Sequence, residues 1–94
     1  MATTPEGKVK DAVKKFLKEK GIWFFCPMQN GFGVVGIPDF ICCDRGRFLA
    51  IETKAPGKIK NVSPNQAQRI VEIRKAGGIA VVIDDVSQLE KEFE

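Results

Sequence analysis

The sequence predicts an α/β fold in which a small mixed β-sheet is flanked by helices, and two observations support that prediction. Apolar residues recur at helical spacing in two long segments, whereas four short segments are rich in β-branched and aromatic residues. Their order along the chain is helix, three strands, helix, strand and a last short helix. A chain of 94 residues is the size of one domain, and we expect residues 1–94 to form it.

The first helix is expected to follow Thr4 and to end at Gly21. Threonine is a favourable N-cap residue, the proline after it suits the first helical position, and glycine commonly ends a helix. Lysines occupy most of the outer surface, and the apolar face consists of Val9, Ala12, Val13, Phe16 and Leu17. The helix is therefore amphipathic with a basic exterior.

Three strands are expected next, separated by glycine-containing segments. The first covers residues 22–25, and core packing explains its aromatic side chains better than stacking on a nucleic-acid base does. A loop over residues 28–36 then leads to strands at 37–43 and 48–54. The glycine in the connecting segment Asp44–Arg47 favours a tight hairpin turn.

A capping-box pattern marks the start of the second long helix, because Ser63 is followed three residues later by Gln66. A glycine pair ends this helix. The strand Ile79–Ile83 is apolar throughout, which is typical of a strand in the centre of a sheet. A last short helix is expected to be capped by Asp84 or Asp85.

The composition excludes several classes of protein. The chain has no histidine, and its three cysteines form no Cys-x-x-Cys pair, so a zinc finger is excluded. The adjacent Cys42 and Cys43, within an apolar strand, are most simply explained as small apolar residues of a reduced, intracellular protein. No apolar run approaches the roughly 18 residues of a membrane span. We therefore expect a cytoplasmic protein with no membrane contact and no small-molecule cofactor.

Charge is unevenly distributed along the chain. Residues 1–60 carry eleven Lys and Arg against six Asp and Glu, whereas residues 61–94 carry four against six. A basic face could attract a polyanion such as nucleic acid, but on charge alone the lysines are more simply explained as the solvated surface of helices. Charge excludes neither alternative.

Three charged residues, Asp39, Glu52 and Lys54, stand on hairpin strands that are otherwise almost entirely apolar. Counting outward from the turn makes Asp39 the partner of Glu52, and Lys54, two residues on, points to the same face. Two carboxylates this close need a proton or a cation between them. An oxygen-liganded ion such as Mg²⁺ meets that need, and the lysine could stabilise charge on a phosphate. A salt-bridge cluster on an exposed sheet face is the alternative.

These residues lie in motifs that resemble the PD-(D/E)XK nuclease signature, GIPDF at 36–40 and IETK at 51–54. The wider order of features is similar to that of the VRR-NUC family: a glutamate early in the first helix, a G-x-PD strand, an E-x-K strand, an S-x-x-Q helix start, and a glycine pair before an apolar strand. The resemblance covers roughly residues 5–90. It implies a restriction-endonuclease-like αβββαβα core and a single VRR-NUC-like nuclease domain.

The resemblance also implies roles for individual residues. Asp39 and Glu52 match the metal-binding acids, and Lys54 matches the catalytic lysine. The main-chain carbonyl of Thr53 would be a further metal ligand. Glu6 matches a helix glutamate that helps to bind the metal, although an acid in a first turn also favours the helix dipole.

Further residues are assigned around this centre. Gln66 matches a glutamine that supports the active site, and it competes for that role with its place in the capping box. Basic side chains that could grip DNA phosphates are Arg45 and Arg47 in the turn and Lys58 and Lys60 in the loop after the hairpin. Each of them could also be an ordinary solvated charge.

The function implied is that of a Mg²⁺- or Mn²⁺-dependent DNA endonuclease. Small stand-alone members of the family, encoded by phages or bacteria, are similar in fold to Holliday junction resolvases, so we expect a homodimer that selects branched DNA. The chain departs from the family pattern at Cys26-Pro27-Met28, where a polar or basic residue is common. The alternatives are a non-catalytic DNA-binding module that retains the acidic cluster, and a structural protein whose cluster binds no metal.

Overall fold

The computed structural model describes residues 4–28 and 33–93, and its helices and strands follow the predicted order. They are α1 (Pro5–Glu19), β1 (Trp23–Phe25), β2 (Phe40–Asp44), β3 (Arg47–Thr53), α2 (Pro64–Lys75), β4 (Ile79–Ile83), α3 (Ser87–Glu90) and the 3₁₀ turn η1 (Lys91–Phe93). The predicted α/β fold is confirmed. Part of the predicted loop 28–36, namely residues 29–32, lies outside the described residues.

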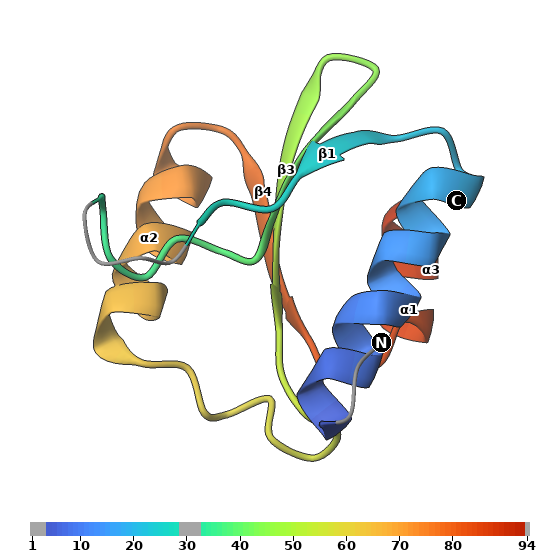
Figure 1. Cartoon of the computed structure of the whole chain (residues 1–94). Coiled ribbons are helices and arrows are strands. Elements are labelled where there is room, and N and C mark those ends of the chain that lie inside the picture. Colours follow the sequence, from blue (N-terminus) through green and yellow to red (C-terminus); the bar gives the residue numbers. More distant parts are fainter. Residues whose placement is uncertain (1–3, 29–32, 94) are drawn as a thin grey trace.

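The strands form one mixed sheet in the order β1-β2-β3-β4 (Figure 1). The pairs β1–β2 and β2–β3 are antiparallel, and β4 joins β3 in parallel. The prediction that residues 79–83 form a central strand is therefore wrong, because β4 lies at an edge of the described sheet. Its residues are all apolar since both of its faces are covered, with alternate side chains packing into two different cores.

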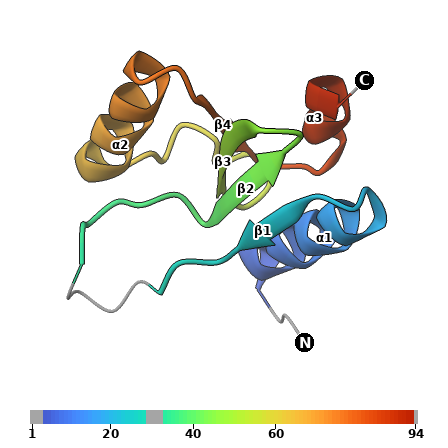
Figure 2. The same cartoon turned by 90° about the horizontal axis from the view of Figure 1, so that it is seen from above.

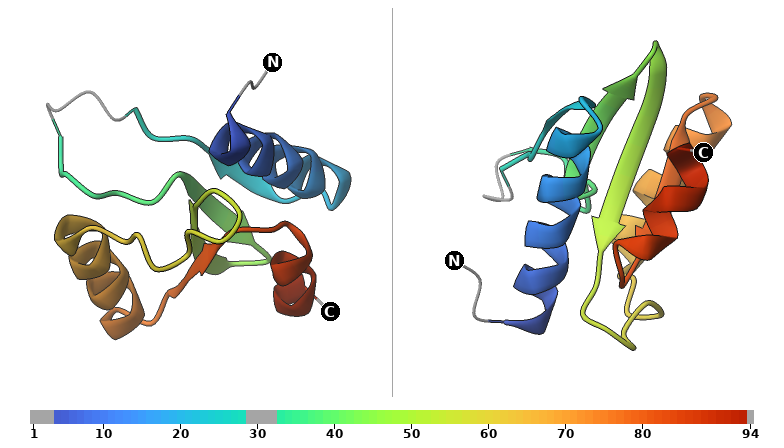
Figure 3. Two further views of the ribbon diagram at one scale, coloured as in Figure 1. Left: turned by 90° about the horizontal axis from the view of Figure 1, so that it is seen from below. Right: turned by 90° about the vertical axis from the view of Figure 1, so that its right-hand side faces the viewer.

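The helices are divided between the two faces of the sheet. Figure 2 shows α1 and α3 on one side and α2 on the other, and Figure 3 shows the same layers from two further directions. The larger core lies under α1 and α3 and includes Val13, Leu17, Phe40, Ile51 and Leu89. The smaller core lies under α2 and contains Ala50, Ile70 and Ala80. The sheet is thus covered on both sides at β3 and β4.

The aromatic residues of β1 do not all pack as predicted. Phe24 does contact the larger core, where its ring centroid lies 5.9 Å from that of Phe40. Trp23 and Phe25 point to the opposite face, beyond the reach of α2, and are 62% and 48% exposed. The prediction of core packing is therefore wrong for these two residues, because a helix covers only one face of β1.

The hairpin has the register that was counted from its turn. Phe40 pairs with Ile51, and the pairing continues to Asp44 opposite Arg47. The first strand is shorter than predicted, since β2 begins at Phe40 rather than at residue 37. The preceding Pro38 has no backbone N–H to contribute to the ladder, which explains why the pairing stops there.

Both long helices begin with the predicted caps. Thr4 accepts a hydrogen bond from an amide of the first turn of α1, and Ser63 and Gln66 form a complete capping box on α2. The short α3 differs from the prediction, because its N-cap position is Val86 and no side chain caps it. Asp85 instead accepts a hydrogen bond from the backbone of the next turn. No helix in the described ranges is both long and apolar enough to cross a membrane.

The three cysteines are all free thiols. Cys42 is buried in the larger core, and burial raises the pKa of its thiol to about 12, so it behaves as the small apolar residue that was predicted. Cys43 is exposed, and for it that prediction is wrong; Cys26, to which the prediction did not apply, is exposed as well. Cys43 alternates with Cys42 along β2 and therefore faces the other side of the sheet.

Candidate active site

The predicted acids and lysine meet at one end of the β2–β3 hairpin, opposite its turn. Asp39 stands just before β2, Glu52 lies near the end of β3, and Lys54 directly follows β3. The N-terminus of α2 supplies Gln66, and the first turns of α1 lie on the other side. In Figure 1 this is the lower end of the sheet, away from the turn at the top.

Asp39 is fixed by the backbone that follows Glu52. Its Oδ2 accepts hydrogen bonds from the Thr53 amide at 2.9 Å and from the Thr53 hydroxyl at 2.7 Å. In a longer hairpin the Thr53 amide would face residue 38, so the carboxylate takes the place of the ladder bond at the end of β2. The side chain of Asp39 is only 15% exposed, and its position is therefore set by the sheet itself.

Glu52 is the most deeply buried charged residue among those the structure describes, with 3% exposure. Its Oε2 accepts a hydrogen bond from Gln66 Nε2 at 2.9 Å and lies 3.4 Å from Lys54 Nζ. Its Oε1 is buried and has no hydrogen-bond partner in the described part of the chain. Burial, followed by the nearby charge of Asp39, raises the pKa of Glu52 to about 7, although Lys54 acts in the opposite direction.

Gln66 connects this pair to the helix cap. Its Oε1 accepts hydrogen bonds from Lys54 Nζ at 2.9 Å and from the Ser63 amide at 3.0 Å, while its Nε2 donates to Glu52. The sequence left open whether Gln66 serves the capping box or the acidic cluster. The structure shows contacts to both, because one carbonyl oxygen can accept two hydrogen bonds.

Lys10 is a site residue that the sequence analysis missed. Its Nζ lies 3.4 Å from Glu6 Oε2 and 3.5 Å from Asp39 Oδ1. Glu6 therefore reaches the acidic pair only through this lysine. The signal that could have indicated Lys10 is its spacing, since residues four apart on a helix lie side by side.

A glycine allows the chain segment that precedes Asp39 to pass close to α2. Gly36 has φ +79°, and a Cβ at this position would lie 2.5 Å from the backbone carbon of Asn65. Such a distance is not possible without displacing one of the two segments. Gly36 therefore holds the segment before Asp39 against the first turn of α2, beside Gln66.

The candidate DNA-binding residues divide into two places. Arg45 and Arg47 lie at the far end of the hairpin, where both form ion pairs with Asp44. The structure does not bring them to the acidic pair. Lys58 and Lys60 are exposed in the loop that begins directly after Lys54, and that loop is tied to the end of β4 by a hydrogen bond from Gly57 to Asp84.

The oxygen atoms of this site suit one hard divalent cation that also binds water or phosphate oxygens. They are too few to form a metal site from side chains alone. No three Asp, Glu or Cys side chains gather into a metal site in residues 4–28 and 33–93. Asp39 and Glu52 nevertheless supply two carboxylates, and the unpartnered Oε1 of Glu52 is an oxygen that can coordinate a cation. Mg²⁺ characteristically takes one or two carboxylates and completes its shell with water and phosphate oxygens. The residues present therefore fit such an ion.

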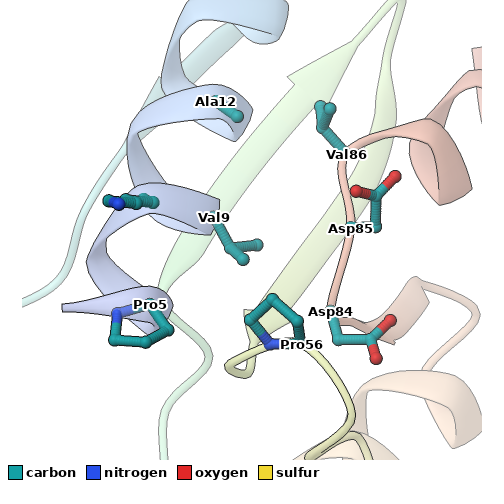
Figure 4. Close-up of a pocket in the computed structure, with 8 residues that line it drawn as sticks. Pro5, Val9, Ala12, Pro56, Asp84, Asp85 and Val86 are labelled. Carbon is teal, nitrogen blue, oxygen red and sulfur yellow. The ribbon is translucent and has the colours of Figure 1, made fainter.

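A separate hollow of about 300 Å³ lies between α1, Pro56 and the turn after β4, as Figure 4 shows. Its two acids already accept hydrogen bonds, Asp84 from Gly57 and Asp85 from Ser87. Among the described residues that line it, Lys8 is the one basic side chain. The acidic cluster, which consists of Asp39, Glu52, Lys54 and Gln66, does not line this hollow, so the hollow is not the candidate active site.

Comparison with known proteins supports the relationship that the motifs implied. No protein-family model matches the chain, and no curated protein matches it. A solved structure described as "VRR_NUC domain" is similar, with 26% identity and a TM-score of 0.74, over 97% of this chain and 96% of that one. An agreement of fold over nearly the whole of both chains is not produced by a shared motif alone. The protein therefore has the fold of the VRR-NUC family, and the resemblance found in its sequence motifs is confirmed at that level.

Proposed function

We propose that the protein is a divalent-metal-dependent nuclease that hydrolyses phosphodiester bonds of DNA at Asp39, Glu52 and Lys54. The observation that carries the proposal is the unpartnered, buried Oε1 of Glu52 beside a second fixed carboxylate. A buried carboxylate oxygen without a partner is costly unless a cation or proton completes it. The similarity to a solved VRR_NUC domain supports the same reading.

The chain's own residues account for most of the chemistry. Mg²⁺ or Mn²⁺, held by Asp39, Glu52 and the Thr53 carbonyl, would polarise the phosphate and supply an activated water. Lys54 would stabilise the negative charge that develops on the phosphate oxygens as water attacks phosphorus. Gln66 keeps the Lys54 ammonium in place through the 2.9 Å hydrogen bond. The reaction adds the elements of water across one P–O bond and needs no other reactant.

The basic loop after β3 supplies a surface for the substrate. Lys58 and Lys60 are exposed and follow Lys54 in the chain, so a DNA strand that reaches the acidic pair would pass beside them. Arg45 and Arg47 are separated from this end by the length of β3, which is about 20 Å for seven extended residues. They could contact only a more distant part of the same DNA.

Calorimetric titration and a cleavage assay test the proposal together. Mn²⁺ should bind the wild type, and Asp39→Ala should abolish that binding, whereas Glu19→Ala, at the far end of α1, should not. Labelled linear, nicked, flapped and four-way DNA should be cut only when metal is present. Metal binding without cleavage of any substrate would favour the non-catalytic DNA-binding module. A flat titration would favour a structural protein whose ion-pair cluster binds no metal.

Selection of branched DNA by a homodimer is the finer part of the proposal. Trp23, Phe25 and Phe48 are exposed on the same face of the sheet as α2, in the part of that face that α2 does not cover. An apolar hollow beside them is lined by Phe48, Ile73, Ala76 and Gly78. Clustered exposed aromatic residues are typical of a protein interface, and a dimer would present two active sites to a branched substrate.

Light scattering tests the dimer. Trp23→Glu should convert a dimer into a monomer and reduce cleavage of four-way DNA more than that of linear DNA. Val71→Glu provides the matched control, because it places the same charge on an exposed apolar residue outside this cluster. A wild type that is monomeric at all concentrations would contradict the dimer while leaving the metal-dependent chemistry intact.

A further inference from the structure

The Lys10 ammonium lies between two carboxylates from different parts of the fold. Its distances are 3.4 Å to Glu6 Oε2, on the same helix, and 3.5 Å to Asp39 Oδ1, before β2. The other oxygen of Asp39 is occupied by the amide and hydroxyl of Thr53. Asp39 therefore faces Thr53 with one oxygen and a fixed positive charge with the other.

The Lys10 ammonium occupies the kind of position in which two carboxylates would share a metal ion. Two-metal phosphodiesterases hold a second ion about 3.5–4 Å from the first, bridged by a common carboxylate. Here Asp39 is the carboxylate common to both sides, and the position between it and Glu6 is taken by an ammonium. An ammonium in contact with two carboxylates supplies the positive charge that a second metal ion would bring to this position.

The ammonium is open to a further ligand on one side. A hollow of about 210 Å³ is lined by Lys10, Lys14, Cys26, Pro27, Asp39 and Phe40. Its two lysines and its position beside Asp39 suit a phosphate group of bound DNA. Lys10 can donate three hydrogen bonds, and the two carboxylates use two of them.

We propose that Lys10 serves as a built-in cation, so that the protein binds a single divalent ion at Asp39 and Glu52 and Glu6 is not a ligand of that ion. The inference rests on the proposed metal-dependent function and specifies its stoichiometry. Lys10 neutralises the outer side of Asp39 and faces the neighbouring DNA phosphate. An ammonium cannot act as a Lewis acid, so its contribution is charge and position.

Titration of the DNA-free protein with Mn²⁺ tests this without depending on cleavage. The wild type should bind one ion. Glu6→Gln should retain one ion with an affinity within about fivefold of the wild type, because only an exposed ion pair is lost. Lys10→Met should gain a second, weaker binding event, since Glu6 and Asp39 then face each other without a cation, and the double variant should lose that event again.

Two further variants separate charge from structure. Lys10→Arg should restore single-ion binding, because the positive charge returns. Lys14→Met removes a lysine from the same hollow one turn along α1 and should leave the stoichiometry at one. Thermal unfolding of each variant should show that the fold is retained, since these side chains are at least partly exposed.

Several outcomes would overturn the inference. Two ions on the wild type would do so, as would a loss of about tenfold or more in affinity in Glu6→Gln, which is the size expected when a group that holds a metal is removed. A single event in Lys10→Met would also contradict it. All three leave the proposed nuclease function standing, whereas no Mn²⁺ binding by the wild type would overturn both.

Discussion

The two ends of the β2–β3 hairpin carry similar charged residues in very different surroundings. At the turn, Asp44 lies 2.9 Å from Arg47 and 3.3 Å from Arg45, and both arginines are exposed. At the open end, Glu52 and Lys54 are buried and held by a glutamine from α2. Both ends of the hairpin thus place an acid beside a basic residue. The candidate active site differs because its charges are buried and because Glu52 Oε1 has no hydrogen-bond partner among the described residues.

The difference shows why sequence spacing alone could not choose between a metal site and a surface salt bridge. Exposed ion pairs contribute little because water screens them. The open end lies between α1 and the start of α2, where the same charges are costly unless each is matched. Experiments that compare the two ends begin with the largest expected effect, at Lys54, and end with the smallest, at Asp44.

Lys54→Met should have the largest effect. Removal of a charged group that acts on the developing phosphate charge should lower the cleavage rate about 10²- to 10³-fold. Arg47→Met is the matched change at the turn and should alter the rate less than about twofold, the scatter expected of a surface change. Single-turnover cleavage in saturating metal measures both, and equal losses in the two variants would contradict the assignment of the active site to the open end.

Glu52→Gln should stabilise the metal-free protein at alkaline pH. The folded-state pKa of about 7 lies above the ordinary value of 4.5, so the stability associated with this group is fully present below pH 4.5 and is lost as the pH rises through 7. At pH 8 the variant should therefore be more stable by about 2–3 kcal/mol, and below pH 5 the difference should disappear. Urea unfolding in a chelator measures this.

Addition of Mn²⁺ provides the control for that experiment. The wild type should gain stability at pH 8 and Glu52→Gln should not, because ligands stabilise only the form that binds them. If the variant is less stable than the wild type at pH 8 without metal, groups of the protein itself stabilise the ionised Glu52 carboxylate.

Gly36→Ala should disturb the open end through the backbone. The new methyl group would overlap the backbone of Asn65, and alanine at φ +79° is strained, so we expect a loss of about 2–4 kcal/mol. Gly57→Ala separates the two causes, because its φ is +80° and a Cβ there meets nothing within 4 Å. Gly57→Ala should lower the stability only by the conformational cost of the positive φ, about 1–2 kcal/mol. Equal losses, measured by chemical denaturation, would rule out the close approach.

Asp44→Asn should have the smallest effect. The hydrogen bond from Arg47, followed by that from Arg45, lowers the pKa of Asp44, but both arginines are exposed, so water and salt screen these interactions. We expect a barely measurable shift of the unfolding midpoint in moderate salt and no change in Mn²⁺ affinity. Loss of metal binding in this variant would show that the two ends are coupled through the hairpin.

Much of this arrangement could be predicted from the sequence because it depends on local rules. The register follows from a short turn, and the capping box follows from Ser63 and Gln66. The alternation of side chains placed Glu52 and Lys54 together. These features are decided within a few residues of the chain, so the motifs that suggested a VRR-NUC domain also predicted its fold.

The features that were missed depend on contacts between distant segments. Lys10 reaches Asp39 only because α1 packs across the sheet, and nothing in the spacing of the hairpin indicates it. Trp23 and Phe25 are exposed because α2 does not extend over β1. The edge position of β4 could not be predicted from an apolar run, because coverage by helices on both faces produces the same pattern as a central position.

Gln66 has a consequence for the dynamics of the protein. The same carbonyl oxygen accepts hydrogen bonds from the Ser63 amide and from Lys54, so fraying of the first turn of α2 and loss of the lysine position are one local unfolding event. Hydrogen exchange at the Ser63 and Gln66 amides should therefore report on assembly of the acidic cluster. A ligand bound to that cluster should slow exchange at the beginning of α2 more than at its end.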